Sequence, residues 1–221
     1  MKLRSRTALL AEFLALFVAL PIALFVLPAR IPPIPFLWLC CLYALTALLR
    51  DPEFSRKKLR GLAALRGQLP SILALFAIGA GATLLAVYCF APATLFDMPR
   101  ERTALWAAVM LLYPLLSVWP QGVIYRAFIL QRYQQLLHIF PAMRENARMA
   151  VMIGASAVSF SLIHIVFHNW IAVALTLPGG ILFGWRYWRT GSHLTASFEH
   201  ALYGCFLFTV GLGRYFYIRF I

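Results

Sequence analysis

The sequence predicts an all-α integral membrane protein, a helical bundle of about seven transmembrane helices, from its composition, its long apolar runs and the placement of its cations. Hydrophobic residues make up 62% of the 221 residues and charged residues only 12%, which leaves too little polar material to cover a soluble surface. The formal net charge of +13 comes from cations gathered in short runs between apolar segments, which is typical of cytoplasmic loops. This placement argues against nucleic acid as a partner and predicts the lipid bilayer instead.

The first part of the chain predicts three membrane spans. Their apolar runs are 8–27, 36–49 and 70–91. The first run is longer than the apolar core of a secretory signal peptide, so we expect it to be a retained span. Glu12 interrupts it, and we expect this side chain to snorkel or to pair near the basic start of the chain. A proline-rich turn at 28–35 separates the first two spans. We interpret 1–221 as a single membrane domain, with these three spans in 1–103.

Basic loops predict the topology. Residues 50–66 carry six cations against two carboxylates, and by the positive-inside rule this loop is cytoplasmic. Counting crossings then places the N-terminus, the 131–148 connection and the 186–189 turn on the same side. The charge-balanced loop at 92–102 should face outward. We therefore expect a protein of the bacterial inner (cytoplasmic) membrane with a cytoplasmic N-terminus.

The remaining residues, 104–221, predict four more spans, at 104–130, 149–167, 170–187 and 194–212. The first of these contains Arg126. An arginine in a segment of lipid-spanning length is expensive, so it should face a partner or a hydrated cavity. Pro114 and Pro120 each remove a backbone donor, so they should bend this span and leave carbonyl groups that need partners.

Polar residues also interrupt two of the other spans. His164 lies in the 149–167 run, and His200 lies in the 194–212 run, directly after Glu199. Polar interruptions in three spans predict one shared intramembrane site. His138 and His193 show no comparable signal, and we expect both to be solvated.

The order of these motifs resembles that of the CPBP family of intramembrane proteases, which includes CAAX prenyl endopeptidases and bacteriocin-processing relatives. The family's three motifs are Glu-Glu-x-x-x-Arg, Phe-x-x-x-His and His-x-x-x-Asn or a similar polar residue. Their counterparts here are Gln121, Gly122 and Arg126; Phe160 and His164; and His200 and Gly204. The turn at 189–192 is similar to the one that precedes the family's last motif. The resemblance covers the C-terminal half of the chain, where it implies a CPBP-like core of four spans in 104–221.

The resemblance implies an endopeptidase in which a glutamate takes a proton from water, while histidines and a polar side chain orient the water or stabilise the oxyanion. It makes candidate catalytic residues of Gln121, Gly122, Arg126, His164 and His200. The first motif is degenerate, because neither Gln121 nor Gly122 can act as a base. A glutamate introduced at position 122 is then expected to restore the missing step.

Glu199 is the candidate substitute for the missing carboxylate. The alternative, which we favour, is that Glu199 forms a buried ion pair with Arg126. A catalytic Glu199 would need its pKa raised, whereas this pairing would lower it.

A metal site is the second alternative for the chemistry. His164 and His168 are four residues apart and, together with His200, could supply three nitrogen ligands to a divalent metal such as zinc. Otherwise we expect no cofactor.

The predicted partner is a membrane-embedded or lipid-associated peptide or protein substrate. Two other functional classes remain open. One is a non-catalytic membrane factor that binds a hydrophobic peptide or a partner's transmembrane helix. The other is a small-solute transporter, which an inverted internal repeat would favour, although we find no such repeat in the sequence.

Overall fold

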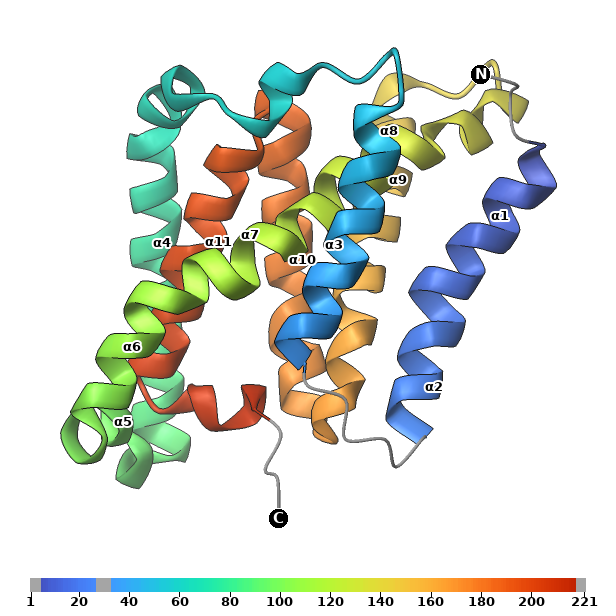
Figure 1. The fold of residues 1–221 in the computed structure, drawn as a ribbon. Helices are drawn as coiled ribbons and strands as arrows, with labels where there is room; N and C mark the ends of the chain where they lie inside the picture. The colour runs from blue at the N-terminus through green and yellow to red at the C-terminus, as the bar shows by residue number, and fades with distance from the viewer. Residues whose placement is uncertain (1–4, 27–32, 218–221) are drawn as a thin grey trace.

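The computed structural model describes residues 5–26 and 33–217, and all regular structure within these ranges is helical (Figure 1). The predicted all-α bundle is confirmed. Four helical stretches are long and apolar enough to cross a membrane: Arg6–Val26, Leu62–Phe90, Thr103–Ile139 and Glu145–Phe167. The described part of the chain also contains a shorter apolar helix at Pro33–Leu49. Most of the predicted turn at 28–35 falls outside the described residues.

The helices follow one another up and down the bundle (Figure 1). The first pass consists of α1 (Arg6–Leu14) and α2 (Leu20–Val26), joined by a π-helical turn. The next two are α3 (Pro33–Leu49) and α4 (Leu62–Phe90), after which comes the short α5 (Asp97–Glu101). The last three are α9 (Glu145–Leu162), α10 (Trp170–Thr190) and α11 (His193–Thr209).

The fourth pass is one long helix that runs diagonally across the bundle in Figure 1. Its α-helical parts are α6 (Thr103–Tyr113), α7 (Trp119–Gly122) and α8 (Ile129–Arg132). π-helical segments interrupt it at Pro114–Val118 and Val123–Phe128. Such interruptions often occur at functional sites, and Arg126 lies in the second one.

Neighbouring helices supply partners for carbonyl groups of this interrupted helix. Pro120 has no N–H to donate to the carbonyl of Leu116, and the indole Nε1 of Trp38 donates to that oxygen at 3.0 Å. The hydroxyl of Ser156 donates to the carbonyl oxygen of Tyr125 at 2.6 Å. The expectation that freed carbonyls would need partners is therefore confirmed for Leu116.

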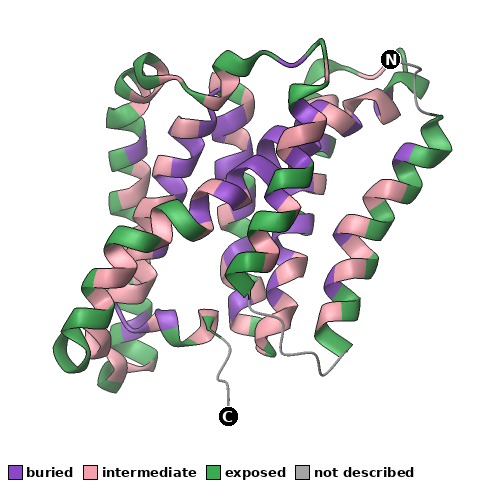
Figure 2. Ribbon diagram, viewed as in Figure 1, coloured by how far each residue is buried: buried purple, intermediate pink, exposed green. Residues whose placement is uncertain are grey.

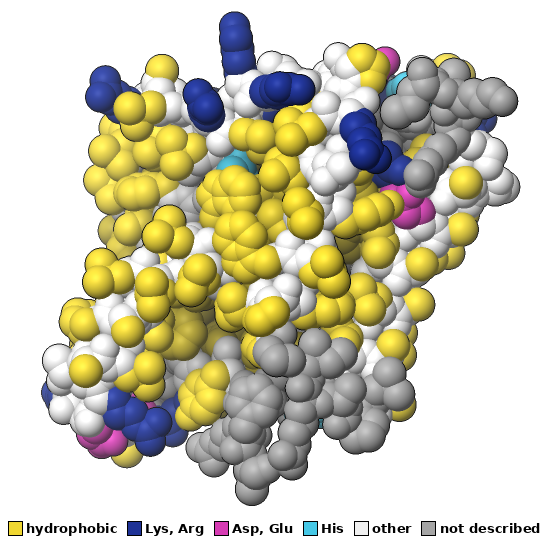
Figure 3. Space-filling view, in the orientation of Figure 1, with side chains coloured by type: hydrophobic (Ala, Val, Ile, Leu, Met, Phe, Trp, Pro, Cys, Tyr) yellow, Lys and Arg dark blue, Asp and Glu magenta, His cyan; other side chains and the backbone are white. Residues whose placement is uncertain are grey.

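Buried residues gather where α7, α9, α10 and α11 meet, whereas α1, α4 and α6 are mostly exposed or half-buried (Figure 2). Helices α9 and α10 approach closely because Gly180 has no side chain: a Cβ there would lie 2.9 Å from the Cα of Ala157. In the space-filling view, hydrophobic side chains cover the middle of the visible face, and lysines and arginines gather along its top edge (Figure 3). This distribution is typical of a protein whose central apolar band contacts lipid.

An ion pair ties the first pass to the long helix. Arg132 forms this pair with Glu12, with 2.8 Å between its Nη2 and Oε2, and the hydroxyl of Tyr133 donates to the same carboxylate at 3.0 Å. Most of the basic start of the chain, where we expected Glu12 to snorkel or to pair, lies outside the described residues. The long helix extends to Ile139, beyond the predicted end of the span, and this extension carries Arg132 to Glu12.

The third pass also begins earlier than predicted. Helix α4 starts at Leu62 and contains Pro70 in its interior. The leucine and alanine residues before the proline are good helix formers, so the helix continues through it with the local loss of one hydrogen bond.

The loops rich in cations lie at one end of the bundle. The 50–61 connection, the start of α1, the 140–144 connection and the turn between α10 and α11 are at the top in Figure 1, and α5 is at the bottom. Arg186 is an exception to the expected 186–189 turn, because it lies inside α10 with 0% exposure.

This arrangement predicts that positions 56 and 144 face one side of the membrane and position 97 the other. Single cysteines would replace Arg56, Arg144 and Asp97 in a chain from which the four native cysteines have been removed. An impermeant thiol reagent applied to intact cells should label only the cysteine at 97, because basic loops are expected on the cytoplasmic side. Labelling of position 144 but not of position 97 would show the opposite orientation.

Candidate functional site

Arg126 is a buried cation without a hydrogen-bonding partner among the described residues. Its side chain is 1% exposed, and Nε, Nη1 and Nη2 are all buried and unpaired. The guanidinium carbon lies 4.3 Å from the ring centroid of Phe160 and 5.3 Å from that of Phe183. These aromatic faces attract the charge but leave every N–H free. The side chain is therefore able to donate to a polar or anionic group of a ligand.

Two histidines from two other helices lie against the same aromatic rings. His200 stacks on Phe183 with 4.7 Å between ring centroids and meets the edge of Phe160 at 5.3 Å. His164 lies 4.9 Å from Phe160. The structure thus brings together Arg126, His164 and His200, which the sequence places in three separate spans.

The hydrogen bonds of these histidines leave ring nitrogens available. Nδ1 of His164 donates to the carbonyl oxygen of Phe160 at 2.6 Å, so the proton is on Nδ1 and Nε2 is the acceptor. Nε2 of His200 lies 3.4 Å from the hydroxyl of Tyr113, and its Nδ1 is buried without a partner among the described residues. Both rings can therefore hold a water molecule or a peptide group.

Tyr113 belongs to this cluster, although no motif pointed to it. A Cβ placed on Gly204 would collide with the phenol ring of Tyr113. The hydroxyl group that approaches His200 therefore occupies the space in which a side chain at position 204 would begin. The hydroxyl group of Tyr113, from α6, thus supplies a polar group at the place where Gly204 of α11 has no side chain.

Gln121 and Gly122 lie one turn before Arg126. Nε2 of Gln121 donates to the hydroxyl of Ser117 at 3.0 Å, which leaves its carbonyl oxygen as an acceptor. Gly122 is buried against His193 and Ser197.

His193 is 0% exposed, so the expectation that it is solvated is wrong. Ser192 caps α11 by accepting a hydrogen bond from the backbone N–H of Thr195 at 3.2 Å, which makes His193 the first residue of the helix. His193 and His200 are seven residues apart, a spacing that places both on one helical face. This spacing is the sequence signal that could have identified His193.

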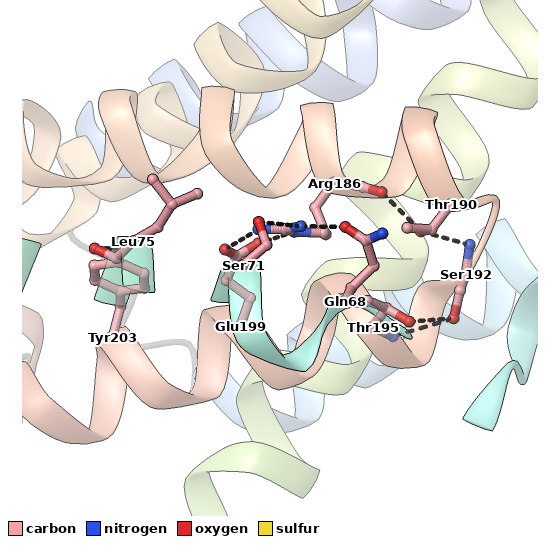
Figure 4. A network of polar contacts seen from close by, with 9 residues as sticks. All are labelled: Gln68, Ser71, Leu75, Arg186, Thr190, Ser192, Thr195, Glu199 and Tyr203. Atoms are coloured by element: carbon pink, nitrogen blue, oxygen red, sulfur yellow. Dashed lines mark hydrogen bonds and ion pairs between the residues drawn. The ribbon is translucent and has the colours of Figure 1, made fainter. Parts of the chain in front are cut away.

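Glu199 does not pair with Arg126, and that prediction is wrong. Its carboxylate forms a two-point ion pair with Arg186, with distances of 2.8 Å from Nε to Oε2 and 2.9 Å from Nη2 to Oε1. Arg186 also donates to Gln68 at 2.6 Å and to Ser71 (Figure 4). Neighbouring helical residues point about 100° apart, so Glu199 faces α4 and α10 while its neighbour His200 faces Phe160.

The structure does not assemble His164, His168 and His200 as a set of metal ligands. His168 has φ 54° and follows a 3-10 turn at Ile163–Phe167, so the four-residue spacing does not produce one helical face. Its ring stacks on Phe25 with 4.7 Å between centroids. Within the described ranges, no three His, Cys, Asp or Glu side chains are grouped to hold a metal ion.

The family model described as type II CAAX prenyl endopeptidase Rce1-like matches residues 103–206. Over this region the chain is similar to the CPBP family of intramembrane proteases. The domain extends from the start of α6 into α11, and it includes Arg126, His164 and His200. The resemblance found in the motifs is thereby confirmed. No curated protein and no solved structure matches the chain.

The fully buried pair between Arg186 and Glu199 gives a prediction for stability. Glu199→Ala should destabilise the protein by about 3–5 kcal/mol, because it leaves the guanidinium of Arg186 buried and uncompensated. The double variant Arg186→Met with Glu199→Leu should recover most of this loss, since it removes both charges. Thermal unfolding in detergent measures both effects.

The matched control is Arg214→Ala, which breaks the partly exposed pair with Asp97. This change should alter the stability by less than about 1 kcal/mol. Equal losses in Glu199→Ala and in the double variant would contradict the pairing.

Proposed function

We propose that this protein is an intramembrane endopeptidase that hydrolyses a peptide bond of a membrane-associated peptide or protein. The observation that carries the proposal is the buried cluster in the CPBP-like region, where the unpaired guanidinium of Arg126 and the rings of His164 and His200 meet at Phe160. A buried cation without a protein partner is expensive in a membrane and marks a functional site.

The cluster supports the hydrolysis of an amide by an activated water molecule. The imidazoles of His164 and His200 would orient the water, because each has a ring nitrogen free for it. Arg126 would stabilise the negative charge that develops on the carbonyl oxygen, since its N–H groups have no partner among the described residues. Gln121 and Arg126 cannot accept a proton, so the proton acceptor in this cluster is an imidazole.

The membrane setting defines the kind of substrate. The site lies among helices long and apolar enough to cross a bilayer, so its substrate is a peptide or protein that is embedded in or attached to the membrane. We place the protein in the bacterial inner membrane with its basic loops in the cytoplasm, because lysine and arginine concentrate on that side.

A non-catalytic binding protein is the second candidate, and a specific observation favours it. Position 122 has no side chain, and Glu199, the substitute carboxylate suggested by the sequence, is held by Arg186. In such a protein, Arg126 would hold an anionic group of a hydrophobic peptide without cleaving the chain.

The endopeptidase proposal predicts that His164→Ala and His200→Ala each lower kcat/KM by about two to four orders of magnitude. Purified protein in liposomes would be incubated with a panel of membrane peptides, and cleavage would be followed by mass spectrometry. His138→Ala is the matched control, because His138 is exposed at the end of the long helix, about three turns beyond Arg126. Peptides that bind and remain intact would support the binding protein instead.

Substitution of Arg126 tests whether this residue acts in function or in structure. Since its charge is buried without a partner, Arg126→Met should leave the thermal stability unchanged or higher. The same change should lower kcat by about 10²–10³-fold, as expected when an oxyanion donor is removed. Arg186→Met, at the paired arginine, should instead lower the stability. A large loss of stability in Arg126→Met would show that Arg126 is a structural residue.

A further inference from the structure

Gly122 and His193 compete for one position in the site. A Cβ built on Gly122 would lie 2.5 Å from Cε1 and 2.9 Å from Nδ1 of His193. Real Cβ atoms do not come so close to a ring that cannot move. The imidazole from α11 therefore fills the volume in which a side chain from the long helix would begin.

The fold holds His193 in this position from several sides. The hydroxyl of Ser192, which caps α11, donates to the carbonyl oxygen of Arg60 at 3.0 Å. The edge of Trp119 packs against the imidazole with 5.3 Å between ring centroids and an interplanar angle of 87°. The hydroxyl of Ser197 lies 3.5 Å from both ring nitrogens, a distance too long for a strong hydrogen bond. The ring also forms a hydrogen bond with the backbone of Gly122, and no side chain among the described residues is a strong partner to it.

His193 also faces the other residues of the cluster. It lies on the same helical face as His200, with about 10 Å of helix rise between the two Cα atoms. His164 and His200 lie against the ring of Phe160, over which the guanidinium of Arg126 is also placed.

We propose that His193 is a catalytic residue of this site, the base that takes the proton from the attacking water in place of a carboxylate at position 122. The inference rests on the endopeptidase function proposed above. It explains why a site without a carboxylate can still activate water. Of the three imidazoles, His193 is the one that packs against Gly122. The side-chain carbonyl oxygen of the preceding residue, Gln121, would orient the same water.

The proposed step is a balanced hydrolysis. A ring nitrogen of His193 takes a proton from water as the water oxygen bonds to the peptide carbonyl carbon. Arg126 stabilises the resulting oxyanion. The carbon–nitrogen bond then breaks, and His193 returns its proton to the leaving amine nitrogen. The products are one carboxylic acid and one amine, and no other reactant is needed.

The test uses the full-length protein in liposomes and the peptide substrates of the cleavage assay. His193→Gln keeps a polar side chain of similar size but removes the base, so kcat should fall by about two to four orders of magnitude. Gly122→Glu alone should give no gain in activity, because the new side chain collides with His193. The double variant Gly122→Glu with His193→Ala vacates that volume and should cleave at least ten times faster than His193→Ala.

The pH profile distinguishes a catalytic base from a packing role. An unperturbed glutamate titrates about two pH units below an imidazole. A general base works in its unprotonated form, so activity falls as the pH drops through the pKa of the base. The acidic limb of the rate profile should therefore move to lower pH in the double variant than in the unmodified protein. A residue that only fills space would leave this limb unchanged.

The outcomes separate this inference from the proposed function. If His193→Gln is folded and cleaves at the unmodified rate while His200→Ala is inactive, the endopeptidase stands and His193 is not the base. A double variant that is folded, but no faster than His193→Ala, also overturns the role of His193. If the unmodified protein and all variants leave every peptide intact, both proposals fail. Thermal unfolding in detergent establishes that each variant is folded.

Discussion

The cost of charge inside a membrane bundle is the constraint on which this structure depends. Two arginines are almost completely buried, and the protein treats them differently. Arg186 is neutralised by Glu199 and bonded to Gln68 and Ser71, whereas Arg126 lies between two phenylalanine rings with its N–H groups unpaired. A buried arginine with a carboxylate partner is part of the architecture, since removing the partner would leave an isolated charge. A buried arginine without one is able to act on a ligand.

The paired charges explain how the helices are held around the unpaired one. The Arg186 network joins α4, α10 and α11 (Figure 4), and the pair between Arg132 and Glu12 joins the long helix to the first pass. Hydrophobic association gives little direction to helices in lipid, because lipid tails are as apolar as leucine, so polar contacts and close packing decide which helices meet. These contacts hold the helices that carry Arg126 and His200, and the hydrogen bond from Ser156 of α9 to the carbonyl oxygen of Tyr125 joins α9 to the long helix.

Two glycines in the site are each matched by a large side chain from another helix. Gly122 lies under the ring of His193, and Gly204 lies under the ring of Tyr113. Protein interiors are close-packed, so a position without a side chain is filled from a neighbouring element. Glycine in a motif position therefore does not leave the site empty. It allows a side chain from elsewhere in the fold to enter, and here both entering groups, an imidazole and a phenol, can exchange protons.

The sequence by itself determined the all-α membrane class and drew attention to Arg126, His164 and His200, because apolar runs and polar interruptions are local patterns that require no knowledge of neighbours. It could also have drawn attention to His193, which shares a helical face with His200.

The tertiary structure decided which side chains are in contact with one another. Glu199 and His200 are adjacent in the chain but face different helices, so only the packing of α10 and α4 could show that Glu199 belongs to Arg186. The contacts of His193 with Gly122 and of Tyr113 with His200 join residues 71 and 87 positions apart. Such contacts depend on how helices tilt and approach one another, which is set by side-chain packing across the whole bundle and leaves no periodic signal in either segment.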